Sequence, residues 1–128
     1  MSFQQIPPTK PGMFTALSIF TLISGILNII SALSLTFAVV IGTFGLGLLC
    51  APLTIAPGIL GIFEILYSMK LLANPPRPTQ PSQVLAILEI CCILFGGVPQ
   101  AAAGIVALVA YNDPGIQQYF ASLNTPVY

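Results

Sequence analysis

The amino-acid sequence predicts an all-α integral membrane protein with four transmembrane helices. The helices form two hairpins, the second of them short, and a short amphipathic helix follows at the C-terminus. Hydrophobic residues make up 56% of the 128 residues and charged residues only 5%, whereas a soluble domain carries about a quarter charged residues. The mean hydropathy is +0.99, and the apolar residues occur in long uninterrupted runs. A soluble fold of this length could not bury so much apolar surface, so lipid must be its solvent.

The first predicted element is a long helix over about residues 13–39, which follows a Pro/Gln-rich tail at residues 1–11. Prolines in the tail favour extended backbone. The apolar run from Met13 continues past residue 40, whereas the apolar part of a secretory signal peptide has about 7–15 residues. We therefore expect this segment to be a retained span.

The second predicted helix covers about residues 57–73, with Pro57 in its first turn. The preceding stretch, IGTFGLGLLCAPLTIAPG, contains four glycines and two prolines. Such a density of helix breakers predicts a hydrophobic connection over residues 40–56, at the far membrane interface. On the other side, NPPRPTQPS has four prolines in nine residues and predicts a stiff polar loop.

The third and fourth predicted helices cover residues 82–95, capped by Ser82, and residues 101–112. Both are shorter than the roughly 20 residues of a full span. Gly96, Gly97 and Pro99 favour a tight turn between them, so we predict a short hairpin. The alternative is a three-span protein in which one helix is kinked at Pro99. In either case a single transmembrane domain covers residues 12–112.

The C-terminal segment, residues 113–128, begins with an Asp-Pro pair that is typical of a helix start. Apolar side chains then recur at helical spacing, which predicts a short amphipathic helix lying on the membrane surface. The predicted interfacial anchors are Ile116, Tyr119, Phe120 and Leu123.

The positive charges predict the orientation of the chain. Lys10, Lys70 and Arg77 flank the first two helices on one side, and residues 40–56 contain no Lys or Arg. The positive-inside rule then places the N-terminus and the loop at residues 74–82 in the cytoplasm. Four spans would return the C-terminus to the cytoplasm, and three would leave it outside.

Two carboxyl groups lie inside apolar runs. Glu64 and Glu89 sit at matching positions on either side of the Pro-rich loop, roughly 10–14 Å below the cytoplasmic boundary by the rise of a helix. No cation is placed to neutralise them, and two adjacent carboxyls in a low dielectric resist ionising together. We predict that at least one is protonated, with a shared proton or a hydrogen bond to the first helix. The predicted polar cluster comprises Glu64, Glu89, Thr21, Ser24, Asn28 and Ser31.

Small residues allow helices to approach closely in lipid. Those expected at helix contacts are Gly25, Ala32, Gly61, Ala103, Gly104 and Ala107.

The sequence predicts no enzymatic activity. It contains no His and no Trp, so the commonest haem ligand and general base are missing. Its three cysteines lack a fourth ligand for zinc, no Gly-rich phosphate loop is found, and three charges of each sign leave no basic patch for nucleic acid. We therefore expect no catalytic residues, no cofactor and no metal site.

The stretch LAILEICCILFGGVPQAAAGIVALVAYNDPGIQQYF resembles the Gly-turn helical hairpin of small bacterial multi-span membrane proteins of unknown function. The pair Cys91 and Cys92, with GIVAL at Gly104 to Leu108, is also faintly similar to the hairpin of the dispanin (interferon-induced transmembrane) family. The chain departs from the dispanin pattern because its cysteine pair follows Glu89 and no basic residues follow the second helix. The resemblance covers about a third of the chain and implies a hairpin topology.

These features together predict a non-enzymatic accessory or scaffold subunit of a membrane protein complex. Its expected partners are the lipid bilayer and either other membrane subunits or further copies of itself. An alternative function is a proton- or cation-coupled conduit or sensor that uses Glu64 and Glu89. In the accessory role, the same pair would be a hydrogen-bonded clasp between helices.

Overall fold

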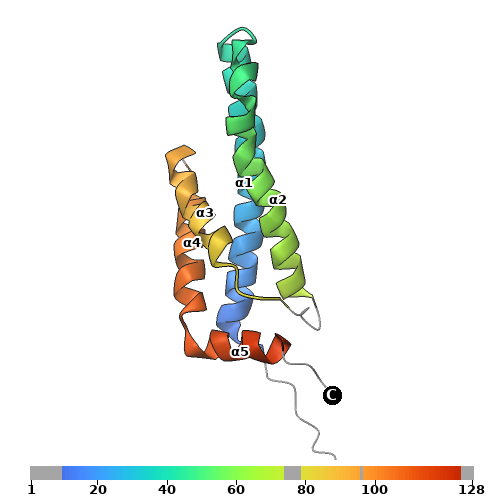
Figure 1. Ribbon diagram of the computed structural model, residues 1–128, viewed down its shortest axis with the longest axis vertical. Helices are drawn as coiled ribbons and strands as arrows, with labels where there is room; N and C mark the ends of the chain where they lie inside the picture. The colour runs from blue at the N-terminus through green and yellow to red at the C-terminus, as the bar shows by residue number, and fades with distance from the viewer. Residues whose placement is uncertain (1–9, 74–78, 96, 125–128) are drawn as a thin grey trace, which may run out of the picture.

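Figure 1 shows a computed structural model of the chain, which describes residues 10–73, 79–95 and 97–124. Helices account for nearly all of these residues and no strand occurs among them, so the prediction of an all-α fold is confirmed. The elements are α1 (Gly12–Gly42), η1 (Leu46–Cys50), α2 (Ala51–Leu72), α3 (Gln83–Cys91), η2 (Cys92–Phe95), α4 (Val98–Tyr111) and α5 (Pro114–Asn124). Most of the predicted N-terminal tail and Arg77 lie outside the described residues.

The first hairpin is long and consists of α1, η1 and α2. The 31 residues of α1 give it a length of about 46 Å. The chain reverses at Phe44 and Gly45, whose φ angles of 52° and 93° are left-handed. Glycine adopts this conformation without steric cost. Thr43 Oγ1 fastens the turn, because it donates to the Val39 carbonyl and accepts from Gly47 N.

The predicted connection over residues 40–56 is wrong in extent, because only residues 43–45 are non-helical. Helical structure resumes at Leu46, and α2 begins at Ala51 instead of residue 57. The prolines do not prevent this. Pro52 occupies the first turn, where its missing N–H needs no partner, and Pro57 lies inside the helix, where it removes one hydrogen bond. In apolar surroundings a helix pairs the remaining peptide groups, which an irregular connection would leave unsatisfied.

Glycines set the distance between α1 and α2. A Cβ added at Gly61 would lie 2.5 Å from the Gly25 carbonyl oxygen, and one added at Gly25 would lie 2.8 Å from the Gly61 carbonyl oxygen. Ala32 packs on Gly58 further along the hairpin. The two backbones therefore touch at a point where any side chain would force the helices apart.

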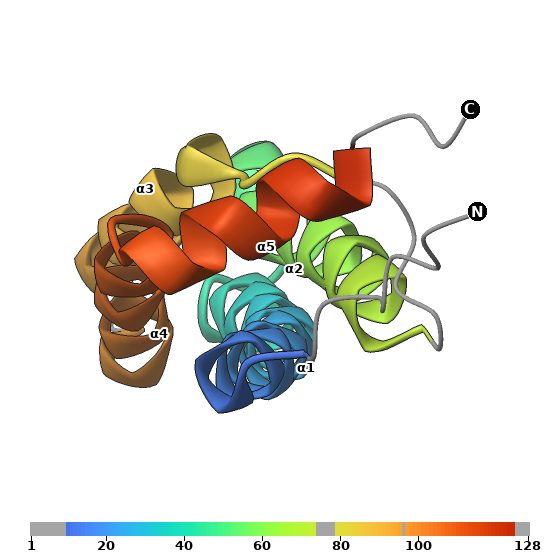
Figure 2. The same ribbon diagram turned by 90° about the horizontal axis from the view of Figure 1, so that it is seen from below.

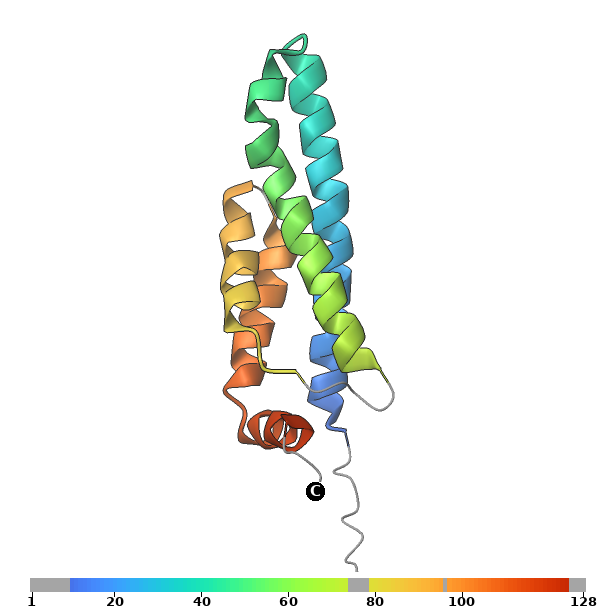
Figure 3. The same cartoon turned by 45° about the vertical axis from the view of Figure 1, so that its right-hand side comes forward.

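The second hairpin consists of α3, η2 and α4, which run antiparallel beside the lower part of α1 (Figure 3). The chain turns between η2 and α4 and does not continue as one helix kinked at Pro99. The fourth helix begins at Val98, three residues before its predicted start, because Pro99 fits the first turn of a helix. Gly104 lies against the Ala86 carbonyl, where an added Cβ would come within 2.5 Å. The predicted packing residues Ala103 and Ala107 are buried.

The last helix, α5, crosses the base of the bundle (Figure 2). Asp113 Oδ1 caps it by accepting a hydrogen bond from Ile116 N at 3.1 Å. The predicted anchor residues pack inside the protein: Tyr119 and Phe120 lie on Phe14, with ring centroids 4.5 and 5.3 Å apart. Ile116 is also buried, and Leu123 packs against the same cluster. The helix is amphipathic as expected, but its apolar face closes the open end of the bundle.

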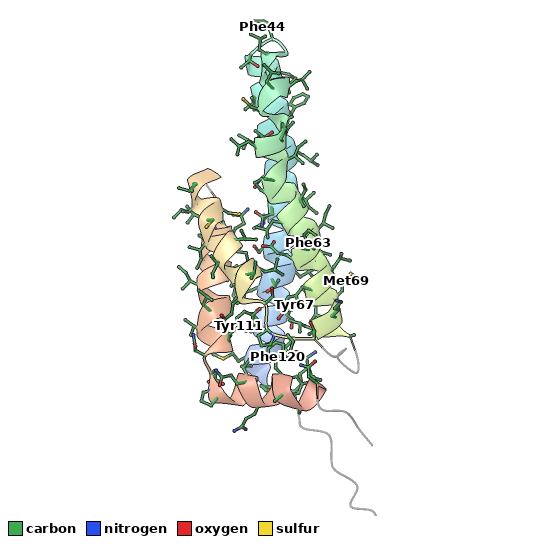
Figure 4. All side chains as sticks on the ribbon, in the orientation of Figure 1. Phe44, Phe63, Tyr67, Met69, Tyr111 and Phe120 are labelled. Carbon is green, nitrogen blue, oxygen red and sulfur yellow. The ribbon has the colours of Figure 1, made fainter. Side chains whose placement is uncertain are left out.

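Two segments are long and apolar enough to cross a membrane. They are Gly12–Gly42 and Leu46–Leu72, with mean hydropathies of 2.1 and 2.0 over their most apolar windows. The helical stretches of the second hairpin, Gln83–Leu94 and Val98–Tyr111, are apolar but shorter. Large apolar side chains point outward along both hairpins, up to Phe44 at the tip of the first one (Figure 4).

Candidate functional site

A cluster of polar side chains is buried where the two hairpins meet. It contains Ser24 and Asn28 from α1, Glu64 from α2 and Glu89 from α3, and none of the four is more than 2% exposed. We call these four residues the oxygen cluster. The structure thus brings together four of the six residues predicted to form a polar cluster.

Glycines on neighbouring helices make room for both carboxyl side chains. A Cβ added at Gly25 would lie 3.1 Å from the Cβ of Glu64, and one added at Gly104 would lie 2.9 Å from the Cβ of Glu89. Each glutamate stem therefore packs on a glycine of another helix. The same close helix contacts that hold the hairpins together thus position the two carboxyls.

The two carboxyl groups lie within hydrogen-bonding reach of each other, and Ser24 lies beside both. Asn28 Nδ2 donates to Glu64 Oε2 at 2.9 Å. A hydrogen bond between two carboxyls requires a proton on one of them, because ionised carboxylates only accept. Among the described residues, Glu64 Oε1, Glu89 Oε1 and Ser24 Oγ make no hydrogen bond of good geometry.

A small cavity of about 30 Å³ adjoins the cluster, on the side facing the tip of the second hairpin. Asn28 lines it, together with Ser31, Cys92 and Gln100. Gln100 Nε2 donates to Ser31 Oγ at 3.4 Å, whereas Gln100 Oε1 is buried without a partner in the described part of the chain. A cavity of this size and polarity can hold a water molecule.

No positive side chain neutralises the oxygen cluster within the described residues. Lys10 Nζ donates to the Leu71 carbonyl at 3.1 Å and lies 5.4 Å from the centre of the Phe14 ring, near the base of the bundle. Lys70 is exposed at the end of α2. The buried carboxyls can therefore avoid an uncompensated charge only through bound protons or a bound cation.

The other two predicted members of the cluster flank it. Thr21 is buried, but its hydroxyl donates to the Leu17 carbonyl at 2.9 Å and not to a carboxylate. Ser31 is exposed and lies at the rim of the cavity. Among the described residues, no three His, Cys, Asp or Glu side chains gather into a metal-binding group.

Sequence reasoning missed a second polar contact, nearer the base. Tyr111 Oη donates to Tyr67 Oη at 3.2 Å, and Tyr67 Oη bonds to the Gln80 carbonyl and accepts from Ser82 N, both at 3.2 Å. Figure 4 shows the two tyrosines between the hairpins. The contact ties the segment before α3 to both hairpins. Its only sequence signal was a tyrosine near the C-terminal end of each of two apolar helices.

Comparison of the chain with protein-family models, curated proteins and solved structures finds no match.

Proposed function

We propose that the chain is a multi-pass integral membrane protein that acts as a non-enzymatic accessory or scaffold subunit. One observation carries this proposal. The first hairpin extends well beyond the tip of the second (Figure 1), and its outer part exposes large apolar side chains, among them Leu33, Phe37 and Leu49 at 68%, 70% and 86%. Exposed apolar patches of this extent mark a membrane or protein interface.

The lengths of the two hairpins suggest that they reach to different depths in the bilayer. At about 46 Å, α1 is long enough to cross a hydrocarbon core of about 30 Å with a tilt. The 14 residues of α4 reach only about 21 Å. The second hairpin would then enter from the cytoplasmic side and turn back within a locally thinned bilayer. Both termini and the loop at residues 74–82 would lie in the cytoplasm.

The outer part of α1 offers a face suited to a partner helix. Ser31 touches Gln100 at the tip of the second hairpin, and Ser34, Ala38 and Gly42 continue along α1 beyond it, all exposed. Residues spaced by four lie on one face of a helix, and small residues there allow another helix to approach closely. A partner helix could thus continue, further out, the packing that α4 makes on α1.

This role can be tested with one substitution and a matched control. Ala38→Leu adds bulk to the proposed face, whereas Ala102→Leu makes the same change at an exposed position of α4. Purification in mild detergent should recover the chain with a partner subunit or a second copy, and Ala38→Leu should reduce that recovery about tenfold. A strictly monomeric protein, or equal recovery for both variants, would contradict the accessory role.

A further inference from the structure

We propose that the oxygen cluster is a binding site for a monovalent cation, Na⁺, which exchanges with a proton on the carboxyl pair. This inference goes beyond the accessory role and does not depend on it. The site would lie between the two hairpins, where α1, α2 and α3 each contribute an oxygen atom that no hydrogen bond satisfies within the described residues.

The charge of the cluster favours a monovalent ion. When a single proton joins Glu64 and Glu89, the pair carries one negative charge. Asn28 and Ser24 are neutral, and the other titratable groups near the pair, Cys92 and Tyr111, are uncharged at neutral pH. A single positive ion would restore neutrality. A divalent ion would require removal of the proton that joins the carboxyls.

The number of available oxygen ligands also favours a monovalent ion. Glu64 Oε1, Glu89 Oε1 and Ser24 Oγ are buried and make no hydrogen bond of good geometry, and the three side chains lie within reach of one another. Calcium takes about 6–8 oxygen ligands, and magnesium demands octahedral geometry and keeps several waters. Three protein oxygens, with water from the adjoining cavity, are too few for a calcium site but suit a weakly held alkali ion.

The cavity of about 30 Å³ supplies room for that water. Asn28 belongs to both the oxygen cluster and the cavity wall, because it donates to Glu64 and also lines the cavity. Gln100 Oε1 is buried and unpartnered on the cavity wall, so it can accept a hydrogen bond from a water molecule that the cation holds.

The competing explanation is a clasp in which both carboxyls are protonated. It also gives a neutral cluster, since each acid group could donate to a neighbouring oxygen. The two states differ by one exchange. The O–H bond of the second acid breaks, its proton leaves to solvent, and the resulting carboxylate takes up Na⁺. Sodium binding should therefore release a proton, whereas a clasp binds no sodium.

The test uses the purified full chain in detergent, with choline replacing sodium at constant ionic strength. We expect radioactive sodium to bind saturably, at about one ion per chain at about pH 8, with release of about one proton that a pH-sensitive dye detects. Over the pH range in which the competing carboxyl is protonated, the apparent affinity should fall about tenfold for each unit by which the pH is lowered, because one proton competes with one sodium ion. Sodium should also raise the thermal unfolding midpoint.

Three variants make the test specific. The double variant Glu64→Gln, Glu89→Gln should abolish sodium binding, because no carboxylate then remains in the cluster. Ser24→Ala removes a hydroxyl that makes no hydrogen bond of good geometry, so the protein should still fold while its sodium affinity falls about tenfold. Asp113→Asn alters a carboxyl outside the cluster and preserves the cap of α5, so binding should not change. Absence of sodium binding by the folded wild-type chain between about pH 6 and 9, or equal binding by Ser24→Ala and wild type, would overturn the proposal.

Discussion

The contact between Gly25 and Gly61 provides a sharp test of how the first hairpin is held together. Replacing Gly61 with alanine places a methyl group 2.5 Å from the Gly25 carbonyl oxygen. Ordinary contacts begin at about 3.4 Å, so the helices must separate by about 0.9 Å. The new Cβ is fixed to the main chain and the Gly25 oxygen belongs to the main chain, so no side-chain rotation can relieve the overlap.

The expected loss of stability has two parts. Overpacking of a close contact costs about 1–3 kcal/mol. The separation also stretches the bond from Asn28 Nδ2 to Glu64 Oε2, which is 2.9 Å long, beyond hydrogen-bonding distance. Loss of a buried hydrogen bond costs a further 1–3 kcal/mol or so. We therefore expect Gly61→Ala to lower the free energy of unfolding by about 2–5 kcal/mol.

Gly42→Ala is the matched control. A Cβ added at Gly42 meets nothing within 4 Å, and alanine is favoured over glycine in a helix by up to about 1 kcal/mol. The same chemical change should thus be neutral or stabilising at position 42 and destabilising at position 61. Unfolding of both variants in mixed micelles, followed by circular dichroism, gives the comparison. Equal stabilities would refute the close backbone contact on which the arrangement of the cluster depends.

Three further predictions concern the polar groups between the hairpins. Asn28→Ala should lower the free energy of unfolding by about 1–3 kcal/mol, because it removes the donor to Glu64; an unchanged melting temperature would show that this bond is not formed. Tyr67→Phe should destabilise more than Tyr111→Phe, by about 1 kcal/mol in thermal unfolding, because Tyr67 Oη also bonds to backbone before α3; the reverse order would contradict the network. Glu64→Gln and Glu89→Gln should leave proton flux into liposomes unchanged, because the site binds an ion without conducting it; reduced flux would indicate a conduit.

The sequence predicted the fold class because the apolar runs are long and almost uncharged. The extent of α2 was underestimated because a proline in a sequence predicts a helix break whatever its position in the helix. The structure shows that Pro52 lies in the first turn of α2 and Pro57 lies inside it. Helix periodicity identified the apolar face of α5. It could not show that this face covers Phe14 instead of lipid, since both surroundings favour the same residues.

The candidate site was predictable in part. Equal depth on two adjacent helices is enough to pair Glu64 with Glu89, and the polar stripe of α1 contains Ser24 and Asn28. The role of Gln100 was not predictable, because it depends on where the tip of the second hairpin meets α1. That position is set by contacts between helices distant in sequence, such as Gly104 on Ala86, which a single sequence does not reveal.

The central claim, a first hairpin that crosses the bilayer with both chain termini on the cytoplasmic side, can be measured directly. In a chain whose three cysteines are replaced by serine, single cysteines are introduced as Phe44→Cys and Ser122→Cys, both at exposed positions. Each is then treated with a membrane-impermeant maleimide in sealed vesicles of known orientation. We predict that Phe44→Cys is labelled only from the outside and Ser122→Cys only from the cytoplasmic side. Labelling of both from the same side would contradict the proposed arrangement in the membrane.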